Sequence, residues 1–196
     1  MSAGAGPVTG PDGRPRCPWG AATLDYREYH DTEWGVPLHG AVALFERLSL
    51  EAFQSGLSWL TILRKRPAFR RAFAGFDPVT VAAFTDDDVA RLLADTGIVR
   101  NRAKIEATMR NARAVVELGA DLDILLWSFA PGRAEHSAPR TLAEVPARTR
   151  ESEAMARALR SRGFTFVGPI TCHALMQATG MVDDHLAGCF RRAAAG

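Results

Sequence analysis

The sequence has few of the features that mark secreted or membrane proteins. None of its apolar runs approaches the roughly 18 residues that a membrane-spanning helix needs. Its first 16 residues, MSAGAGPVTGPDGRPR, lack the apolar core of a signal peptide. Three cysteines are too few, and odd in number, for a disulfide framework, which favours metal binding or free thiols. We therefore expect a cytoplasmic protein without a membrane partner.

Strong net charge and long period-two alternation are also absent. The formal net charge of +2 is too small to indicate nucleic-acid binding by itself. No stretch alternates polar and apolar residues for long enough to require a sheet. Instead, 47% of the residues are hydrophobic, and they recur with helical spacing. This pattern predicts an all-α fold with one globular unit or two small lobes.

Helical spacing and capping residues place the elements of the first half. Apolar residues share one face over residues 40–54, which predicts a helix there. The stretch SWLTILRKRPAFRRAF predicts two short helices, with Pro67 opening the second. Asp77 and Thr85 are the expected N-caps of the next two helices, and a longer helix ends at Gly119.

The second half begins with a connection rich in loop residues over 130–150. The segments ESEAMARALRSRG and ITCHALMQATG predict two helices that end at Gly163 and Gly180, joined by the short turn FTFVGP. The composition of residues 1–16 predicts a disordered tail, which leaves residues 17–192 as the folded domain.

Two pairs of Cys and His stand near the two ends of this domain. His185 and Cys189 are four residues apart, so they would share one face of a final helix. Cys17 and His30 complete a Cys2His2 set, which suits tetrahedral Zn2+. For either pair alone, a small buried cysteine or a capping histidine beside Asp31 is the simpler interpretation. Two pairs together favour a metal, and four protein ligands leave no place for water, so this zinc would be structural.

The other Cys and His residues receive no metal role. Cys172 falls within an apolar helical pattern and is interpreted as a core residue. His39, His136 and His173 have no evident partners in the sequence.

A candidate ligand site centres on LEAFQSGLSW. Glu51 lies beside Leu44 on the helical wheel, at the margin of the apolar face, so its carboxylate is expected to be partly buried. The alternative is an ordinary ion pair with an arginine on a solvated face. Each aromatic residue alone is more simply a core residue, but their crowding near Glu51 favours a pocket for a flat ligand. These aromatic residues are Trp19, Tyr26, Tyr29, Trp34 and Trp59.

The turn RGFTFVGPIT is a candidate phosphate-binding feature. A helix ends at Gly163, Gly168 follows in a hairpin, and Pro169 starts the next helix, whose unpaired amides could bind a phosphate oxygen. The alternative is an ordinary helix connection. Arg160 and Arg162 precede the turn and add positive charge. Other basic residues cluster at Arg64, Lys65, Arg66, Arg70, Arg71, Arg100, Arg102 and Lys104, although such runs are often only a solvated face.

Several motifs together resemble the 3-methyladenine DNA glycosylase I family. They are CPWG, YHDTEWGVP, LEAFQSGLSW, FDPVTVAAF, GIVRNRAKIEA, WSF, RGFTFVGP and MVDDHLAGC, in the family's order across roughly residues 16–190. The resemblance implies a helix-hairpin-helix DNA glycosylase fold, with the hairpin near residues 163–170 and a structural zinc joining the N- and C-terminal segments. It also implies a monofunctional enzyme that excises 3-methyladenine from alkylated double-stranded DNA in base excision repair. We expect a monomer.

The resemblance also implies roles for single residues. Glu51 would be the catalytic carboxylate, and Gly56 and Leu57 would enter the gap left by the flipped nucleotide, with Gly168 in the DNA-binding hairpin. The base would contact Tyr29 and Trp59, with Tyr26 and Trp19 nearby. Zinc would be bound by Cys17, His30, His185 and Cys189.

Two positions bear on the mechanism. Superfamily members that also cleave the strand carry a lysine where this chain has Ile170, so no Schiff base is expected there. Many family members read V-N-D-H where this chain has Asp183, near the catalytic aspartate of other superfamily glycosylases. A helix cap is the preferred interpretation of Asp183.

Two other functional classes compete with this interpretation. A zinc-stabilised DNA-binding module would bind damaged DNA without releasing a base. A zinc hydrolase would need an open coordination position, which four protein ligands do not leave.

Overall fold

The computed structural model describes residues 4–132 and 138–192, and within these residues the fold is all-α, as predicted. His136 lies outside the described residues. The α-helices are α1 (Leu24–Thr32), α2 (Ala41–Gln54), α3 (Trp59–Ala72), α4 (Pro78–Ala82), α5 (Asp86–Ala94), α6 (Arg102–Leu118), α7 (Asp121–Trp127), α8 (Arg150–Arg160) and α9 (Pro169–Ala178). Short 3-10 helices are η1 (Pro18–Ala21), η2 (Ala74–Phe76) and η4 (Leu142–Glu144). No described helix is long and apolar enough to cross a membrane.

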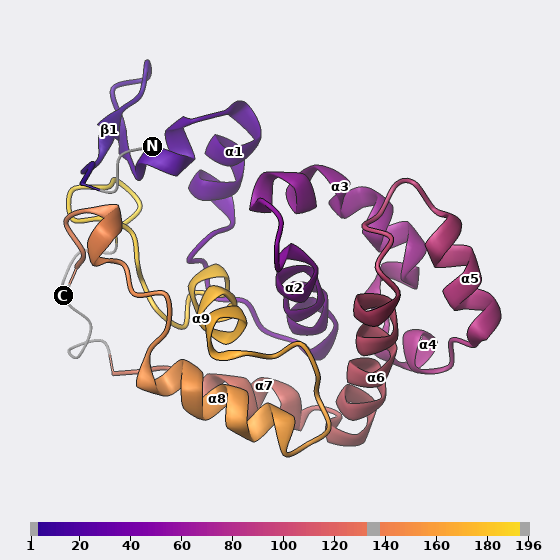
Figure 1. The fold of residues 1–196 in the computed structure, drawn as a ribbon. Coiled ribbons are helices and arrows are strands. Elements are labelled where there is room, and N and C mark those ends of the chain that lie inside the picture. Colours follow the sequence, from indigo (N-terminus) through magenta and orange to yellow (C-terminus); the bar gives the residue numbers. More distant parts are fainter. Residues whose placement is uncertain (1–3, 133–137, 193–196) are drawn as a thin grey trace.

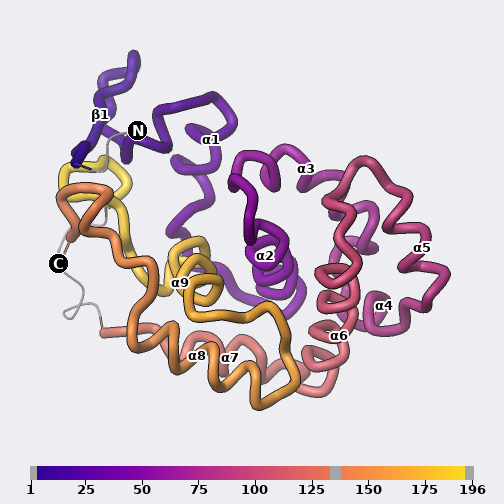
Figure 2. The backbone as a smooth tube through the Cα atoms, viewed as in Figure 1, coloured from indigo at the N-terminus to yellow at the C-terminus, as the bar shows by residue number. Residues whose placement is uncertain are grey.

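Helix α2 is the centre of the fold (Figures 1 and 2). It packs against α3, α6 and α9, while α4 packs on α6 and α8 on α9. Its apolar residues, such as Leu44, Phe45 and Leu48, are fully buried, which confirms the helix predicted over residues 40–54. Because α2 touches both the α3 side and the α9 side, its C-terminal half is placed to form the floor of a site between them.

The predicted caps of the first half are confirmed. The Asp77 side chain accepts a hydrogen bond from the backbone N–H of Thr80 at 2.9 Å, and Thr85 starts α5 with a capping box that includes Asp88. Gly119 follows α6 with a positive φ of 57°. These signals act within one helical turn, so the sequence alone is enough to find them.

The region around Pro67 differs from the prediction. Trp59–Ala72 is one helix, α3, with Pro67 inside it rather than at the start of a second helix. Pro67 is exposed, so the carbonyl that loses its intrahelical partner lies on the solvent side of the helix. The helix gains more from burying Ile62 and Phe69 on its other face than it loses at one hydrogen bond.

The segment after α9 also differs. Residues 181–192 form bends and turns and no helix, so His185 and Cys189 do not share a helix face. The chain leaves α9 through Gly180 (φ 73°), where an added Cβ would lie 2.8 Å from backbone atoms of residues 35–37. This close crossing turns the C-terminal segment back toward α1, where it lies beside the N-terminal hairpin (Figure 1).

The N-terminal residues are more ordered than their composition predicts. Val8–Thr9 (β1) pairs in antiparallel register with Pro15–Arg16 (β2), and Arg16 is buried. The disorder expected over residues 1–16 is therefore wrong for the hairpin, in which Arg16 pairs with Asp12 and backbone hydrogen bonds close the turn. The division of residues 17–192 into two lobes stays a prediction.

Candidate metal centre and base-binding pocket

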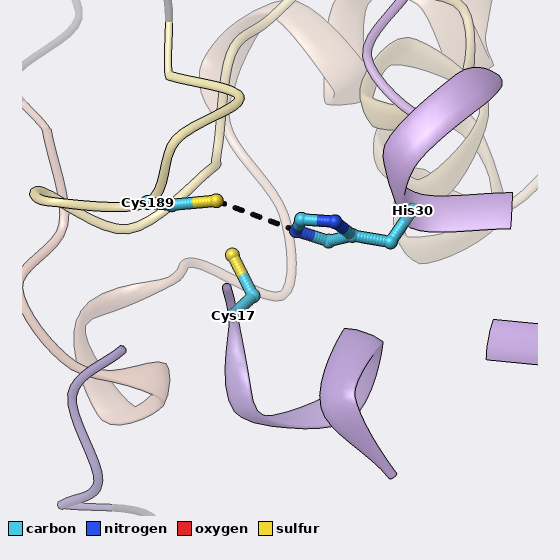
Figure 3. Close-up of side chains that lie close together, drawn as sticks. All are labelled: Cys17, His30 and Cys189. Atoms are coloured by element: carbon cyan, nitrogen blue, oxygen red, sulfur yellow. Dashed lines mark hydrogen bonds between the residues drawn. The ribbon is translucent and has the colours of Figure 1, made fainter. Parts of the chain in front are cut away.

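Three of the four predicted metal ligands come together in the structure. The candidate ligand atoms of Cys17, His30 and Cys189 all lie within 4.8 Å of one another, and all three residues are buried. His30 Nε2 is 3.4 Å from Cys189 Sγ (Figure 3). Cys17 precedes η1, His30 is in the last turn of α1, and Cys189 is in the C-terminal turn. Tertiary packing, rather than helix spacing, makes this group, which could hold a metal ion.

His185 lies beside this group but outside it. Its ring centroid is 5.1 Å from that of His30. Its Nδ1 is 2.8 Å from Asp183 Oδ1, while its Nε2 is buried without a hydrogen-bond partner among the described residues. A buried ring nitrogen without a partner is unfavourable, so this atom is a suitable fourth donor for a bound metal.

The two thiols interact directly. The pKa of Cys189 is lowered to about 4, because Cys17 donates a hydrogen bond to it, with a smaller contribution from His30. The same hydrogen bond, together with burial, raises the pKa of Cys17. One thiolate is thus favoured in the cluster, and the thiolate is the form that binds metals.

Two glycines let the histidine rings fit, a detail that the sequence analysis missed. A Cβ at Gly20 would lie 2.6 Å from the His30 ring, and one at Gly35 would lie 2.7 Å from His185 Cε1. Gly35 also has a positive φ of 77°. The glycines of the CPWG and EWG motifs therefore provide the space in which the two rings pack.

A pocket of about 430 Å3 lies next to the metal centre, and all five predicted base-site residues line it. These residues are Trp19, Tyr26, Tyr29, Glu51 and Trp59. Trp34, Gln54 and residues 142 and 145–147 complete this part of the wall. The pocket joins α1, the end of α2, the start of α3, α9 and the η4 segment, and its volume suits one small aromatic ligand.

Glu51 is buried in this pocket rather than paired on the surface. Its residue is only 6% exposed, and burial raises the pKa of its carboxyl to about 7, an effect that Arg47 partly opposes. Among the described residues, none donates a side-chain hydrogen bond to this carboxylate. Glu51 thus changes charge near neutral pH and has free acceptor capacity.

Arg47 is a buried residue behind the aromatic wall that the sequence analysis missed. It lies one turn before Glu51 and donates a hydrogen bond to the Tyr29 hydroxyl at 2.9 Å. Its guanidinium lies 5.3 Å from the Tyr29 ring centroid and 5.5 Å from that of Trp59. The carboxylate of Glu33 balances this buried charge, with its Oε2 3.4 Å from Arg47 Nη2.

The aromatic rings hold one another in place. The ring centroids of Tyr29 and Trp59 are 5.3 Å apart, and the two ring planes are tilted by 44°. The rings of Trp19 and Tyr26 meet edge-on, with their centroids 5.6 Å apart. The Tyr26 hydroxyl accepts a hydrogen bond from the backbone N–H of Leu60, which ties α1 to the start of α3. The rings therefore form a pre-arranged wall for stacking.

The opposite wall comes from α9 and the segment after it, and it was not predicted. Ile170, His173, Ala174 and Gln177 fall on one helix face and line the pocket. His173 does have a partner: its Nε2 is 3.1 Å from Asp184 Oδ2, which also accepts from Gln177 at 2.7 Å. The i, i+3, i+4, i+7 spacing on α9 is visible in the sequence, but it does not show which element that face meets.

The predicted DNA-contacting positions lie in two exposed turns. Gly56 (φ 81°) and Leu57 (42% exposed) connect α2 to α3. Lys104 holds this turn by donating to the carbonyls of Phe53 (2.8 Å) and Ser55 (2.6 Å). The turn therefore presents Leu57 from a fixed backbone.

The second turn, between α8 and α9, is the predicted hairpin. Gly168 is the N-cap of α9, and Ile170 in its first turn is 64% exposed. The buried Asn111 exchanges two hydrogen bonds with the backbone of Thr165, at 3.0 and 2.8 Å. The α6 side chain thus fixes the shape of the hairpin.

The basic runs carry less free charge than the sequence suggests. Arg64, Arg66 and Arg70 form ion pairs with Asp25, Glu33 and Glu46 respectively. Lys65 donates to the carbonyls of Thr96 and Gly97, and Lys104 is buried. A large part of these runs is therefore engaged within the fold.

His39 and Asp183 also have partners in the structure. His39 Nδ1 is 2.9 Å from Asp123 Oδ1 and its ring stacks on Trp127, two partners that the sequence analysis did not identify. Asp183 cannot cap a final helix, because residues 181–192 form no helix. Instead, its Oδ1 accepts from the backbone N–H of His185 at 3.1 Å and contacts the ring of the same residue.

Comparisons with known proteins agree on one family. The methyladenine glycosylase family matches residues 19–192. DNA-3-methyladenine glycosylase 1 of Escherichia coli K12 is 45% identical over 177 residues, which are 89% of this chain and 95% of that protein. A crystal structure of 3-methyladenine DNA glycosylase I has 44% identity and a TM-score of 0.87, covering 91% of this chain and all of that one. A variant of a 3-methyladenine DNA glycosylase I in complex with 3-methyladenine has 33% identity and a TM-score of 0.83, covering 89% and 96%.

Proposed function

Because this chain belongs to the methyladenine glycosylase family, we propose that it excises 3-methyladenine from alkylated double-stranded DNA by hydrolysing the N-glycosidic bond, the first step of base excision repair. The observation that carries the proposal is the position of Glu51 in a pocket walled by Tyr29 and Trp59. Its carboxylate is buried and receives no hydrogen bond from the residues that the structure describes. That combination suits a flat ligand with positive charge.

The proposed recognition uses the charge of the damaged base. The nucleotide must leave the duplex to reach a pocket of this kind, and a damaged base is extruded at lower cost than an intact one. 3-Methyladenine in DNA is cationic, so stacking on Tyr29 and Trp59 adds a cation–π contribution that neutral adenine lacks. Glu51 would accept hydrogen bonds from the base edge and balance its charge.

The proposed chemistry needs little acid catalysis. The bond between C1′ and the base breaks with its electron pair passing to the cationic base, which leaves as the neutral molecule. Water adds its oxygen to C1′ and releases a proton to solvent, and an abasic site remains. Glu51 would stabilise the positive charge of the bound base and of the sugar as the bond breaks.

Strand cleavage through a lysine Schiff base is not part of the proposal. Lys65 and Lys104 are the only lysines of the chain, and neither lines the pocket. Both donate to backbone carbonyls, and the position two residues after the hairpin glycine, Gly168, is Ile170. A monofunctional glycosylase follows from this arrangement.

We further propose that the buried cluster binds a structural Zn2+ through Cys17, His30, His185 and Cys189. The donor set supports this assignment, as does the Nε2 of His185, which has no partner within residues 4–132 and 138–192. When bound, the ion would cross-link the two ends of the chain and would not activate a water molecule. Asp183 would then hold the His185 ring and take no part in base release.

Contacts to DNA are proposed at the two exposed turns. Leu57, next to Gly56, would fill the gap left by the extruded nucleotide, and the backbone around Gly168 would meet a phosphate at the start of α9. The enzyme would act as a monomer, and its cytoplasmic location stays a prediction.

Incubation with methylated DNA tests the activity directly. Chromatography of the released bases should show 3-methyladenine, and Glu51→Gln should slow its release about 10- to 100-fold, the expected loss for a hydrogen bond to a charged group. Glu106→Gln, an exposed carboxylate change on α6, is the matched control and should keep the normal rate. Absence of any free base would refute the proposal, and borohydride trapping of a protein–DNA adduct would refute the monofunctional assignment.

A further inference from the structure

The hairpin of residues 8–16 lies outside the region that matches the family, which begins at residue 19. Figure 1 shows it beside the C-terminal segment, on the side of the molecule that holds the metal centre. Its strands pair Val8 with Arg16 and Thr9 with Pro15. Such a short ladder is marginal by itself, so its contacts with the rest of the protein must hold it.

Arg16 supplies the strongest of these contacts. The residue is only 1% exposed, and its guanidinium lies between two carboxylates. Nη1 and Nη2 donate to the two oxygens of Asp12 at 2.7 and 2.6 Å, while Nε and Nη2 donate to Asp31 at 2.9 and 2.7 Å. A buried guanidinium with two forked partners is held in one orientation.

Asp31 connects Arg16 to the metal centre. Its Oδ1 accepts from Arg16 Nε and is also 2.8 Å from His30 Nδ1. The bond at Nδ1 fixes the ring so that Nε2 points at Cys189 Sγ, 3.4 Å away. A carboxylate behind a metal-binding histidine sets its tautomer and its ring orientation.

The hairpin also holds the neighbour of the second cysteine. The backbone N–H of Phe190 donates to the Pro15 carbonyl at 2.9 Å. The guanidinium groups of Arg14 and Arg16 lie 5.2 and 5.1 Å from the centroid of the Phe190 ring. The same hairpin is therefore bonded to the residue after His30 and to the residue after Cys189.

We propose that the hairpin of residues 8–16 restrains two ligands of the metal site and thereby slows release of the ion. An ion can leave only if a ligand swings away, and the hairpin restrains His30 through Asp31 and Cys189 through Phe190. The inference rests on the proposed zinc site. Arg16 and Asp12 are positioning residues, since neither reaches the cluster itself.

The test measures zinc release from the intact protein into an excess of a chromogenic chelator. Arg16→Met, which keeps the aliphatic stem but removes the fork, leaves the contact of Asp31 with His30 in place. It should release zinc faster, with the roughly 10- to 100-fold effect of losing the direct outer partner of a metal ligand as the upper limit. Asp12→Asn leaves the Asp31 contacts in place and should give a smaller acceleration. Because Asp12 is partly exposed, this variant tests the inference even if Arg16→Met does not fold.

Two controls separate the effect of the hairpin on zinc release from the effect of lower overall stability. Arg64→Met removes a solvent-exposed ion pair and should release zinc at the normal rate. Lys104→Met weakens the fold far along the chain from the hairpin and should also leave the release rate unchanged well below its unfolding temperature. Equal release rates in the normal protein, Arg16→Met and Asp12→Asn would overturn the inference. Lack of zinc binding by the normal protein, measured by elemental analysis, would instead refute the metal proposal itself.

Discussion

Glu51→Gln should make the protein more stable at alkaline pH while it impairs base release. Burial raises the pKa of Glu51 from 4.5 to about 7, so the folded state binds the proton more tightly than the unfolded state does. Below pH 4.5 the carboxyl is neutral in both states, and it imposes no charge penalty. Between pH 4.5 and about 7 the unfolded chain ionises while the folded chain resists burying the charge, so stability is lost across this window and stays at the lower level above it.

The size of the effect follows from the two pKa values. Their difference corresponds to about 3 kcal/mol of destabilisation above pH 7 in the normal protein. Glutamine has nearly the same shape and no charge, so the substitution should recover up to about 3 kcal/mol at pH 9 and almost nothing at pH 4. For a chain of this length, that gain is about 6–12 °C in Tm.

Urea unfolding at pH 4 and pH 9 provides the assay, with equal m-values required for the comparison. Glu106→Gln, on the exposed face of α6, should change stability by less than about 0.5 kcal/mol at either pH. If Glu51→Gln proved less stable than the normal protein at pH 9, or changed stability equally at both pH values, the buried-charge explanation would be wrong. The gain in stability together with the loss of base release would show that this pocket favours function over stability.

Two other side chains give predictions of the same kind. Arg47→Met removes the positive charge that lowers the pKa of Glu51, so the midpoint of the pH–rate profile for base release should move above 7. The Arg47→Lys variant keeps the charge and should stay close to the normal midpoint. A uniform loss of rate at every pH would indicate only a packing defect. Lys104→Met deletes two hydrogen bonds to the end of α2 and should lower the free energy of unfolding by about 2 kcal/mol in urea titrations. The same variant should bind more weakly to DNA that contains an abasic site. Unchanged stability would show that water replaces both bonds.

The local features of the fold could be predicted because each depends on residues within a turn or two. The N-caps at Asp77 and Thr85 and the apolar face of α2 were found in this way. Pro67 was misjudged for the same reason: a proline signals a helix start locally, but the buried face of α3 carries the helix through it.

The site residues could be predicted by type but not by arrangement. Glu51 and the aromatic residues are visible as an unusual cluster in the sequence, and all of them line one pocket. Arg47 looks like any arginine on a helix until tertiary packing covers it, and His173 has no visible partner until Asp184 folds back against α9. Side chains of this kind are defined by neighbours far along the chain.

By itself, the sequence determined the all-α fold, the family resemblance and the chemistry available at Glu51, because helix signals and residue types are local properties. Only the tertiary structure decided that Cys17, His30 and Cys189 meet without a shared helix, and that the N-terminal hairpin is ordered against them. The physical reason is that Cys189 and Phe190 lie more than 150 residues along the chain from His30 and from the hairpin, so they meet only because the core around α2 brings the two chain ends together.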